Sequence, residues 1–555
     1  MSASKLPKSS AVRTGHSLNK NEEEFVNSRR DIVLQCLTTL KISWSQVPKI
    51  ALLGSGGGER AMVGLLGSLD QLGKEGLLDC FLYLSGVSGS TWCMASLYQE
   101  PDWSSNLEAV KQKIVQRLSG NRVSWSEAFS KLKTYFYEKD KFSLTDVWAV
   151  IVVTSYVKEI DEHTLSEKSG QNRKDPYPIY TVIDKQCKQH KGDAWFEATP
   201  HEAGYSLIGA FVDVSKLGSQ FEKGSEIKKQ PEMDMLYLQA LCGSALADEE
   251  EILKFFWQKI KDIFFPVNST KEFEEMLKDP ESPPVDDGYQ VLMHLVDMNL
   301  NVLNGIDPSP HDEAIRAKLT GLSGGKRQLI FEAKTLNITD KVAAKLYMKI
   351  YTEDVCKNLS KRFRFWPFDC WIHICRCMAD WIWGRKYNFL HNMTDESVPT
   401  VLRKSETRDY EDAGLLLNSP FFSVLRKERH INLIISLDFS EGDPFMTVME
   451  TAKKCKELNI PFPEIIMPNE DSKNPQDFYV FKGKGNAPTV IHIPLFNTVN
   501  CGDKIEEWRK KYCTFQGPYS YDMIIELMEV AGKNITNNKD KLVEEIRAAA
   551  NRTMT

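Results

Sequence analysis

The chain has 555 residues, which is enough for three or four domains of ordinary size or for one large enzyme domain with insertions. Its apolar residues (42%) and charged residues (26%) are those of a globular protein with ample core material. The formal net charge of −6 disfavours nucleic acid as a general partner, because nucleic-acid-binding proteins usually present a basic surface. Twelve scattered cysteines and a polar N-terminal segment without an apolar leader predict free thiols in a reducing compartment.

Strands and helices alternate along much of the sequence. The first twenty residues are polar and are predicted to be a disordered extension, and residues 21–545 are predicted to form one domain. A helix, a strand, a glycine loop, a second helix and a second strand are expected in turn at 22–42, 49–53, 54–58, 59–72 and 78–84. Two apolar strands joined by one helix are typical of parallel neighbours in an α/β sheet, whose loops meet at the carboxyl ends of the strands. Further strands are expected at 430–439, 464–468 and 489–495, and further helices at 104–160, 235–262, 340–362 and 520–550.

The glycine loop lies within "GSGGGERAM" at 54–62. Consecutive glycines after a strand allow several amide N–H groups to point at one spot, where they can hold an oxyanion or a phosphate. Gly56, Gly58 and Ala61 fit a dinucleotide-binding pattern loosely, but the next strand ends in "SGVSGS" rather than in an acidic residue. A plain structural turn remains open. A loop that supplies hydrogen-bond donors to a serine on the neighbouring strand explains both glycine clusters best.

The stretch "GVSGS" at 86–90 lies where a predicted strand turns into a predicted helix. Such a corner needs glycines and raises the central side chain, here Ser88, out of the packed backbone. Ser90 stands where the strict G-x-S-x-G pattern has its last glycine. Ser323 in "GLSGG" fits that pattern better, but the charged segment "HDEAIRAKLT" precedes it instead of an apolar strand. Ser88 is therefore the predicted nucleophile.

A nucleophilic serine needs a base. In a Ser-His-Asp triad the base would be a histidine, and His391, His430 and His492 are available, although none lies in a loop that stands out. Asp412 is the stronger candidate, because it precedes an Ala-Gly turn in "EDAGLLLNSPF". A lone Asp-Ala-Gly is usually only a turn, so the triad with a histidine stays open.

Three segments occur in a characteristic order, namely "GSGGGERAM", then "SGVSGSTW", then "DAGLLLNSPF". This order resembles the cytosolic (group IV) phospholipase A2 family, especially its C2-less gamma-type members, and further similar segments extend the resemblance over about residues 20 to 540. The resemblance implies a patatin-like three-layer α/β fold with a central mixed, mainly parallel sheet flanked by helices and with a cap or lid region. Residues 21–545 would then be a single phospholipase catalytic domain with lid insertions.

The resemblance also implies a set of site residues. In this family a serine and an aspartate form the catalytic pair without a histidine, glycine amides hold the oxyanion, and arginines position the substrate phosphate. The corresponding residues here are the catalytic pair Ser88 and Asp412, the oxyanion donors Gly57 and Gly58, and the phosphate-side cations Arg60 and Arg426.

Two features depart from the family pattern. Glu59 occupies a position that is more often apolar, and its charge is expected to neutralise Arg60 in part. The segment "TRDYEDAG" is also more polar than the usual lead-in to the aspartate, so the approach to Asp412 is expected to be more solvated.

No metal or other cofactor is expected. The first motif begins near residue 54, which leaves no room before it for a C2 β-sandwich of about 100 residues, and no EF-hand loop occurs. Membrane contact is therefore expected from the folded surface of segment 361–383, through Arg362, Arg364, Trp366 and Trp371. The alternative for this segment is an apolar helix packed on the core, and the Cys370, His373 and Cys377 that share one helical face are interpreted as packing rather than as zinc ligands.

The resemblance thus implies a calcium-independent phospholipase A2 that cleaves the sn-2 acyl ester of glycerophospholipids through an acyl-enzyme. Transfer of the acyl group to a lysolipid, and lysophospholipase activity, would use the same site. The expected location is the cytoplasm, peripherally on intracellular membranes, with a phospholipid surface as partner and no nucleic acid. A catalytically silent lipid-binding or scaffold protein and a Ser-His-Asp esterase are the alternatives.

Overall fold

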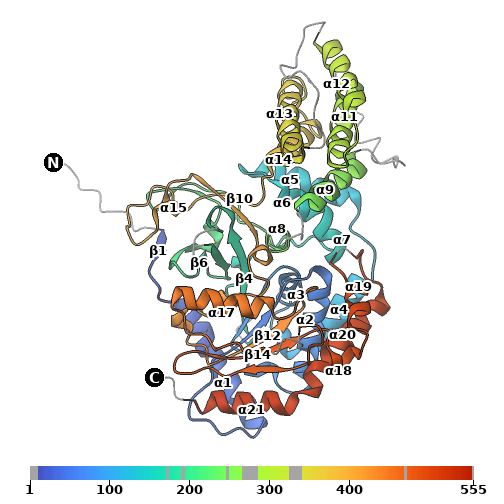
Figure 1. Ribbon diagram of the computed structural model, residues 1–555. Helices are drawn as coiled ribbons and strands as arrows, with labels where there is room; N and C mark the ends of the chain where they lie inside the picture. Colours follow the sequence, from blue (N-terminus) through green and yellow to red (C-terminus); the bar gives the residue numbers. More distant parts are fainter. Residues whose placement is uncertain are drawn as a thin grey trace, which may run out of the picture. The chain divides into compact units, whose positions relative to one another are not determined.

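The computed structural model describes residues 11–170, 174–188, 194–244, 249–264, 285–323, 340–467, 472–514 and 516–552. The chain divides into two compact units. The first, which we call the sheet unit, comprises Met1–Val123, Trp148–Ala245 and Gly384–Thr555. The second, which we call the helical unit, comprises Ser124–Val147 and Leu246–Trp383. Figure 1 shows the elements of both.

A large mixed sheet forms the centre of the sheet unit, with the strands in the order β1-β7-β6-β5-β4-β3-β2-β12-β14-β13. The five strands in its middle run parallel and are β4 (Tyr177–Asp184), β3 (Tyr83–Gly86), β2 (Ile50–Gly54), β12 (Leu433–Asp438) and β14 (Thr489–Pro494). Their residues are buried throughout, as expected for parallel strands that are covered on both faces.

Antiparallel strands extend the sheet on both sides of this parallel centre. One side carries β5 (Trp195–Ala198), β6 (Glu202–Tyr205), β7 (Ala210–Asp213) and β1 (Val12–Thr14), and the other carries β13 (Tyr479–Phe481). Two further strands join at β4, namely β11 (Thr407–Asp412) and its partner β10 (Arg385–Tyr387). A separate hairpin is formed by β8 (Gln220–Glu222) and β9 (Ser225–Lys228).

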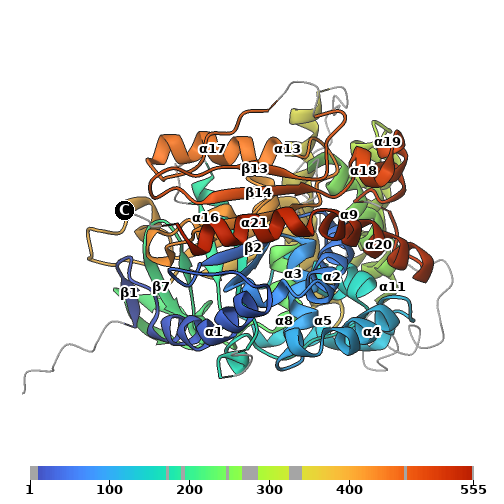
Figure 2. The same ribbon diagram turned by 90° about the horizontal axis from the view of Figure 1, so that it is seen from below.

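Helices cover both faces of the sheet. Helix α17 lies on one face, and α2 with its neighbour α20 lies on the other (Figure 2). This placement follows from right-handed crossovers, because β2 to β3 and β12 to β14 progress in opposite directions across the sheet. The bounds are α1 (Lys20–Thr39), α2 (Gly58–Lys74), α3 (Gly89–Leu97), α4 (Leu107–Leu118), α8 (Met235–Cys242), α16 (Phe421–Val424), α17 (Met446–Leu458), α20 (Tyr521–Asn537) and α21 (Lys539–Ala550). The predicted α/β class, with a central mixed sheet flanked by helices, is confirmed.

Two local predictions are wrong. The strand predicted at 464–468 is not formed over 464–467, while residue 468 lies outside the described part; Pro461 and Pro463, which have no N–H to donate to a ladder, lead into this segment. The stretch predicted as disordered, 1–20, contains β1, which pairs antiparallel with β7, and α1 begins at Lys20. Val12 is buried, and Arg13 binds the buried Glu202 at 2.7 Å, which explains the ordering of this short strand. Residues 1–10 lie outside the described part of the chain.

The helical unit contains α5 (Trp125–Glu138), α9 (Glu249–Phe264), α11 (Val285–Leu303), α12 (Ser309–Leu322), α13 (Lys341–Leu359) and α14 (Phe368–Asp380). His373 on α14 packs edge-on against Phe136 and Phe142. Its pKa is lowered, chiefly by burial. Among the described residues no group of three His, Cys, Asp or Glu side chains is arranged to hold a metal ion. None of the described helices combines the length and the apolar character needed to cross a membrane.

A buried ion network fastens α1 to the sheet. Arg429 binds Glu22 of α1 at 2.8 Å and Glu197 of β5 at 2.8 Å, and Arg426 binds Glu197 at 2.7 Å. All four side chains are almost completely buried. Burial alone would raise the pKa of Glu197, but Arg429 and Arg426 lower it to about 2. Each charge is thus matched, which makes the loss of one partner costly.

Replacing Arg429 with Met should lower the free energy of unfolding by about 3–5 kcal/mol, because Glu22 would remain buried without a cation and Glu197 would keep only Arg426. Urea denaturation at neutral pH measures this. The matched control is Lys113→Met, which removes the exposed pair with Glu100 and should cost about 0–1 kcal/mol. Equal stabilities of the two variants would contradict the role given to the network.

Candidate active site

Ser88 lies at the corner between β3 and α3. It is the residue before the first turn of α3, and its backbone has φ 51° and ψ −125°. A positive φ is costly for a residue with a Cβ, and strained corners of this kind present a nucleophile at the end of a strand. In the described part of the chain no protein group is hydrogen-bonded to the Ser88 hydroxyl. The strain is therefore not explained by a structural hydrogen bond of this side chain.

The corner touches the glycine loop directly. A Cβ added to Gly89 would lie 1.8 Å from the carbonyl oxygen of Gly58, so only glycine fits there. Ser90, which replaces the last glycine of the strict motif, donates a hydrogen bond from its hydroxyl to the carbonyl oxygen of Ser55 at 2.6 Å. The Ser90 hydroxyl, absent from the strict motif, thus links the corner to the residue just before the glycines of the loop.

The glycine loop presents backbone donors beside Ser88. Gly57 has φ 152° and Gly58 has φ 56°, and α2 begins at Gly58. Within the described residues neither of their amides has a hydrogen-bond acceptor. Two helix N-termini, those of α2 and α3, therefore meet at this place and favour negative charge. The geometry is compatible with the predicted oxyanion donors, whose role stays a prediction.

Asp412 comes to the same place through the register of β4. Strand β3 pairs with β4 up to Gly86, which is opposite Tyr180. Beyond that point β11 takes its position along β4, antiparallel, and ends with Asp412 opposite Val182. Because β5 occupies the other edge of β4, β3 and β11 lie on one side of it with their ends facing each other. The end of β3, which leads into Ser88, and the end of β11, which is Asp412, therefore face each other along the same edge of β4.

Asn418 links the glycine loop to the segment after β12, and it was not among the predicted site residues. Its side-chain amide donates to the Gly56 carbonyl at 3.1 Å and to the Ser440 hydroxyl at 2.8 Å. Gly414 donates its N–H to Asp412 Oδ1 at 2.7 Å. A Cβ on Gly414 would lie 3.1 Å from Asp412 Oδ1 and 3.2 Å from Asn418 Oδ1. Only the Asn-Ser-Pro run after the turn hinted at this residue.

The surroundings of Asp412 are not solvated, although the polar residues before it led us to expect this. Asp412 is completely buried. Its polar neighbours are buried with partners of opposite charge, which form the pairs Arg408–Asp184, Asp409–Arg385 and Glu411–Lys188. Because these charges are neutralised by their partners, the end of β11 can be enclosed by protein.

Arg60 lies on α2 below the loop and is fully buried. Its Nε donates to the Phe439 carbonyl at 2.8 Å and its Nη1 to the Tyr512 carbonyl at 2.6 Å. A Cβ on Gly57 would lie 2.9 Å from Arg60 Nη2, so the guanidinium packs directly against the glycine loop. Its predicted contact with a substrate phosphate stays a prediction.

Arg426 belongs to the ion network described above. Its guanidinium binds Glu197 and lies over the ring of Phe211, 4.5 Å from the ring centre. The structure therefore assigns it buried partners other than Ser88, Asp412 and the glycine loop. Its predicted role toward a phosphate stays a prediction.

Glu59 does not pair with Arg60, whose carboxylate partner is Glu441 at 3.4 Å. Instead Glu59 Oε2 accepts the backbone N–H of Tyr519 at 3.0 Å, and its other oxygen is buried without a hydrogen bond. Burial raises the pKa of Glu59 to about 8. The raised pKa favours the neutral form of Glu59, and Glu59 makes no ion pair with Arg60, so the expected neutralisation of Arg60 does not occur.

The three histidines do not form a triad in this arrangement. His492 lies inside β14 and contacts the Ser436 hydroxyl at 3.2 Å and the Pro444 carbonyl at 2.7 Å, so both ring nitrogens are occupied. His391 pairs with Glu222 at 3.1 Å. His430 is exposed and precedes β12, hence lies toward the amino ends of the parallel strands, whereas Ser88 follows a carboxyl end.

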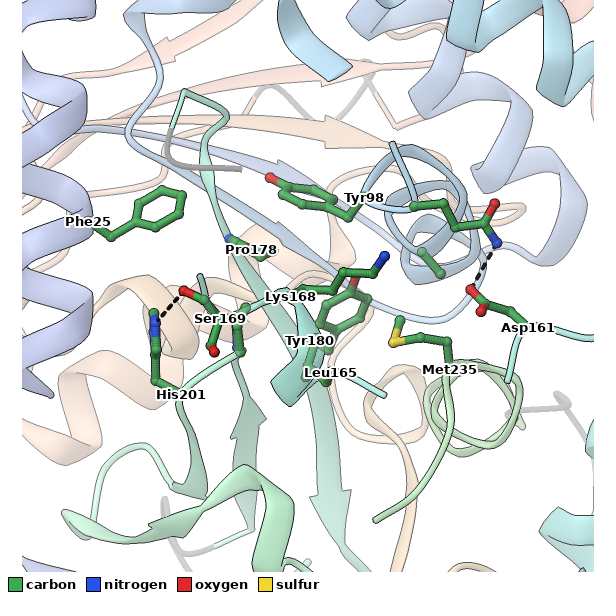
Figure 3. A pocket seen from close by; sticks show the side chains of 13 residues that line it. Phe25, Tyr98, Asp161, Leu165, Lys168, Ser169, Pro178, Tyr180, His201 and Met235 are labelled. Atoms are coloured by element: carbon green, nitrogen blue, oxygen red, sulfur yellow. Dashed lines mark hydrogen bonds between the residues drawn. The ribbon is translucent and has the colours of Figure 1, made fainter. Parts of the chain in front are cut away.

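One well-defined cavity of the sheet unit is too small for a lipid. It lies beside the start of β4, and Phe25, Tyr98, Pro178, Tyr180 and Met235 are among the residues that line it (Figure 3). Its volume of about 10 Å³ has room for one water molecule at most. Neither Ser88 nor Asp412 lines it, so it is separate from the candidate site described above.

The predicted membrane-contact residues belong to the helical unit. Arg362 and Arg364 are exposed, and Trp366 is half-buried with Lys133 5.8 Å from its ring centre. Trp371 is 1% exposed and packs against Phe368, so the prediction that it lies at a surface is wrong. It faces inward because α14 is amphipathic and Trp371 falls on its apolar face.

The chain is similar to known phospholipases over nearly its whole length. The family model of the lysophospholipase catalytic domain matches residues 50–249. Cytosolic phospholipase A2 gamma of Mus musculus is 33% identical over 579 residues, covering 98% of this chain and 93% of the relative. The Homo sapiens protein of that name is 32% identical, covering 98% and 97%. The solved human GIVD cytosolic phospholipase A2 covers 98% of this chain and 69% of its own, with a TM-score of 0.66 and 21% identity, which shows the fold.

Replacing Ser90 with Ala should lower the free energy of unfolding by about 1–3 kcal/mol, because the Ser55 carbonyl loses its buried donor. The glycine loop would also lose its tie to the corner, so kcat should fall. Urea denaturation and an ester hydrolysis assay measure the two effects. Ser68→Ala, which removes only a bond to Gly64 within α2, is the control and should change both less. An equally stable and active Ser90→Ala protein would refute the tie.

The raised pKa of Glu59 predicts a stability that falls with pH. Between its ordinary value of 4.5 and about 8 the folded protein holds a proton that the unfolded chain has lost, so stability is lost as pH rises through this window. Glu59→Gln stays neutral at every pH. Its free energy of unfolding should therefore exceed that of the wild type by about 2–4 kcal/mol at pH 8 and equal it near pH 4. Melting temperatures from pH 4 to 9 test this, with Glu506→Gln, which replaces an exposed carboxylate, as the control.

Proposed function

This chain belongs to the cytosolic phospholipase A2 family and is a phospholipid ester hydrolase, and from this we propose that it cleaves the sn-2 acyl ester of glycerophospholipids with Ser88 as nucleophile and Asp412 as general base. One observation carries the proposal. The strained corner at Ser88 and the end of β11 at Asp412 meet along β4, beside two glycine amides that have no acceptor in the described chain.

In the first half of the reaction, the Ser88 hydroxyl oxygen attacks the ester carbonyl carbon and passes its proton to the Asp412 carboxylate. The carbonyl oxygen becomes an oxyanion, which accepts hydrogen bonds from the Gly57 and Gly58 amides. When the tetrahedral intermediate collapses, the bond to the glycerol oxygen breaks, and that oxygen takes the proton from Asp412. Lysophospholipid leaves, and the acyl group remains on Ser88.

In the second half, a water molecule gives a proton to Asp412 and attacks the acyl carbonyl carbon. The ester bond to Ser88 breaks, its oxygen recovers the proton, and a fatty acid is released. A lysolipid hydroxyl in place of water would give transacylation, and a lysophospholipid substrate would give lysophospholipase activity. These variants need no further residue.

Two physical features support this assignment. Asp412 is completely buried, so the attraction between its carboxylate and the moving proton is weakly screened by water. The N-termini of α2 and α3 both point their partial positive charge at the place where the oxyanion forms. Neither half of the reaction calls for a metal ion, so we propose that calcium is not required.

The substrate is presented by a lipid surface. We propose that the protein acts in the cytoplasm and adsorbs peripherally to intracellular membranes. The exposed Arg362 and Arg364 and the half-buried Trp366 combine cations with an aromatic ring, as is usual at the headgroup level. Arg60 and Arg426 are proposed as phosphate-side cations on the family resemblance alone.

The decisive experiment follows fatty acid and lysolipid release from mixed phospholipid vesicles in EDTA. Ser88→Ala and Asp412→Ala should each lower kcat by about 1,000-fold or more, because either change removes a group that acts at the reacting atoms. The matched control is Ser323→Ala, which removes the serine of the other G-x-S-x-G motif and should remain fully active.

A fluorophosphonate probe gives an independent readout. Human GIVD cytosolic phospholipase A2 has been solved in complex with methyl gamma-linolenyl fluorophosphonate. The wild type and Ser323→Ala should be labelled by this compound in EDTA, and Ser88→Ala should not. Hydrolysis that requires added calcium would refute calcium independence. A wild type that neither hydrolyses lipid nor takes the label would indicate the silent lipid-binding protein instead.

A further inference from the structure

Helix α13 has two apolar faces. Ala344, Met348, Tyr351 and Val355 are buried and pack into the helical unit. Three other aliphatic side chains are exposed, and their exposed fractions are 79% for Val342, 58% for Leu346 and 38% for Ile350. At about 3.6 residues per turn, spacing by four keeps these three on one side, opposite the buried face. We call them the α13 stripe.

The helix cannot turn to bury this stripe without breaking polar contacts. The Tyr351 hydroxyl donates to Asp312 of α12 at 2.6 Å. The Asn299 side chain of α11 donates to the Thr352 hydroxyl at 3.1 Å. Both bonds are buried and fix which side of α13 faces inward. The outward direction of the stripe is therefore built into the unit.

Lysines run alongside the stripe. Lys341, Lys345 and Lys349 each precede one of its residues, and all three are exposed. Lys349 binds Asp380 at 3.0 Å. From Lys341 to Thr352 the sequence contains no acidic residue. Aliphatic side chains beside a column of cations match the border between acyl chains and anionic headgroups, where lysine stems lie along the apolar layer and the ammonium groups reach outward.

We propose that the α13 stripe, together with Lys345, is a contact surface for an anionic phospholipid bilayer. It spans roughly 12 Å along the helix, a size suited to shallow insertion into the headgroup region. The flanking lysines are attracted by acidic lipid headgroups. The inference deepens the proposed function, since it rests on a phospholipid surface as the substrate's environment. It adds a second site to Arg362, Arg364 and Trp366, which follow the helix in sequence.

The test measures binding without hydrolysis. The full-length protein is sedimented with vesicles of diether phosphatidylcholine, with or without diether phosphatidylserine, because ether lipids have no ester to cleave. Leu346→Glu should weaken binding to the anionic vesicles by about tenfold or more, since it places a carboxylate in the apolar layer. The matched control is Ile227→Glu on β9, where the wild-type side chain is also 58% exposed, and its binding should not change.

Charge is tested separately. Lys345→Glu should weaken binding to the anionic vesicles several-fold at low salt, and the difference should shrink in 0.5 M salt, as expected from screening of exposed charges. Hydrolysis of a soluble, monomeric ester by Leu346→Glu should equal that of the wild type, which shows that the variant is folded.

The outcomes separate this inference from the proposed chemistry. Normal vesicle binding by Leu346→Glu overturns the inference, even if the wild type hydrolyses lipid as proposed. Binding that depends on Leu346 in a protein that cleaves no lipid supports the stripe and rejects the chemistry. A wild-type dimer that becomes monomeric in Leu346→Glu, with unchanged vesicle binding, would assign the stripe to a second copy of the chain and overturn the inference.

Discussion

The backbone contact between Gly58 and Gly89 is the constraint on which the site depends. A Cβ on Gly89 would fall 1.8 Å from the Gly58 carbonyl oxygen, so the glycine loop and the corner approach more closely than any side chain would permit. This contact brings the first turns of α2 and α3 together beside Ser88, with the Gly57 and Gly58 amides, which have no acceptor among the residues that the structure describes. Ser90 secures it with a hydrogen bond to Ser55, and Arg60 supports the loop from below through Phe439 and Tyr512.

Strand β4 aligns the end of β11 with the end of β3. It extends beyond the end of β3, and the vacated edge is filled by β11 from a distant part of the sequence. A carboxylate at the end of β11 is thereby fixed by sheet register rather than by a flexible loop, and the buried ion pairs along β11 exclude water from it. Positioning on strands is more precise than positioning on loops, which suits the role of general base proposed for Asp412.

Much of this could be predicted from the sequence, because the decisive signals are local. Apolar runs followed by glycine clusters predicted β2, β3 and the corner, and the order of three motifs pointed to Ser88 and Asp412. What was missed depends on distant partners. Val12 is ordered by β7, the proline-flanked segment 464–467 fails to pair, and Trp371 is buried by its neighbours. Asn418 connects Gly56 with Ser440 over long sequence separations that no local pattern reveals.

The place of β12 in the middle of the sheet has a consequence for synthesis on the ribosome. Strand β2 lies between β3 and β12, so its second edge stays unpaired until residues 433–438 have left the ribosome. Asp412 and Asn418 also come late, more than three hundred residues after Ser88. A nascent chain therefore cannot bring the proposed pair Ser88 and Asp412 together early. The order of the strands alone therefore delays the meeting of Ser88 with the end of β11 until most of the chain has been made.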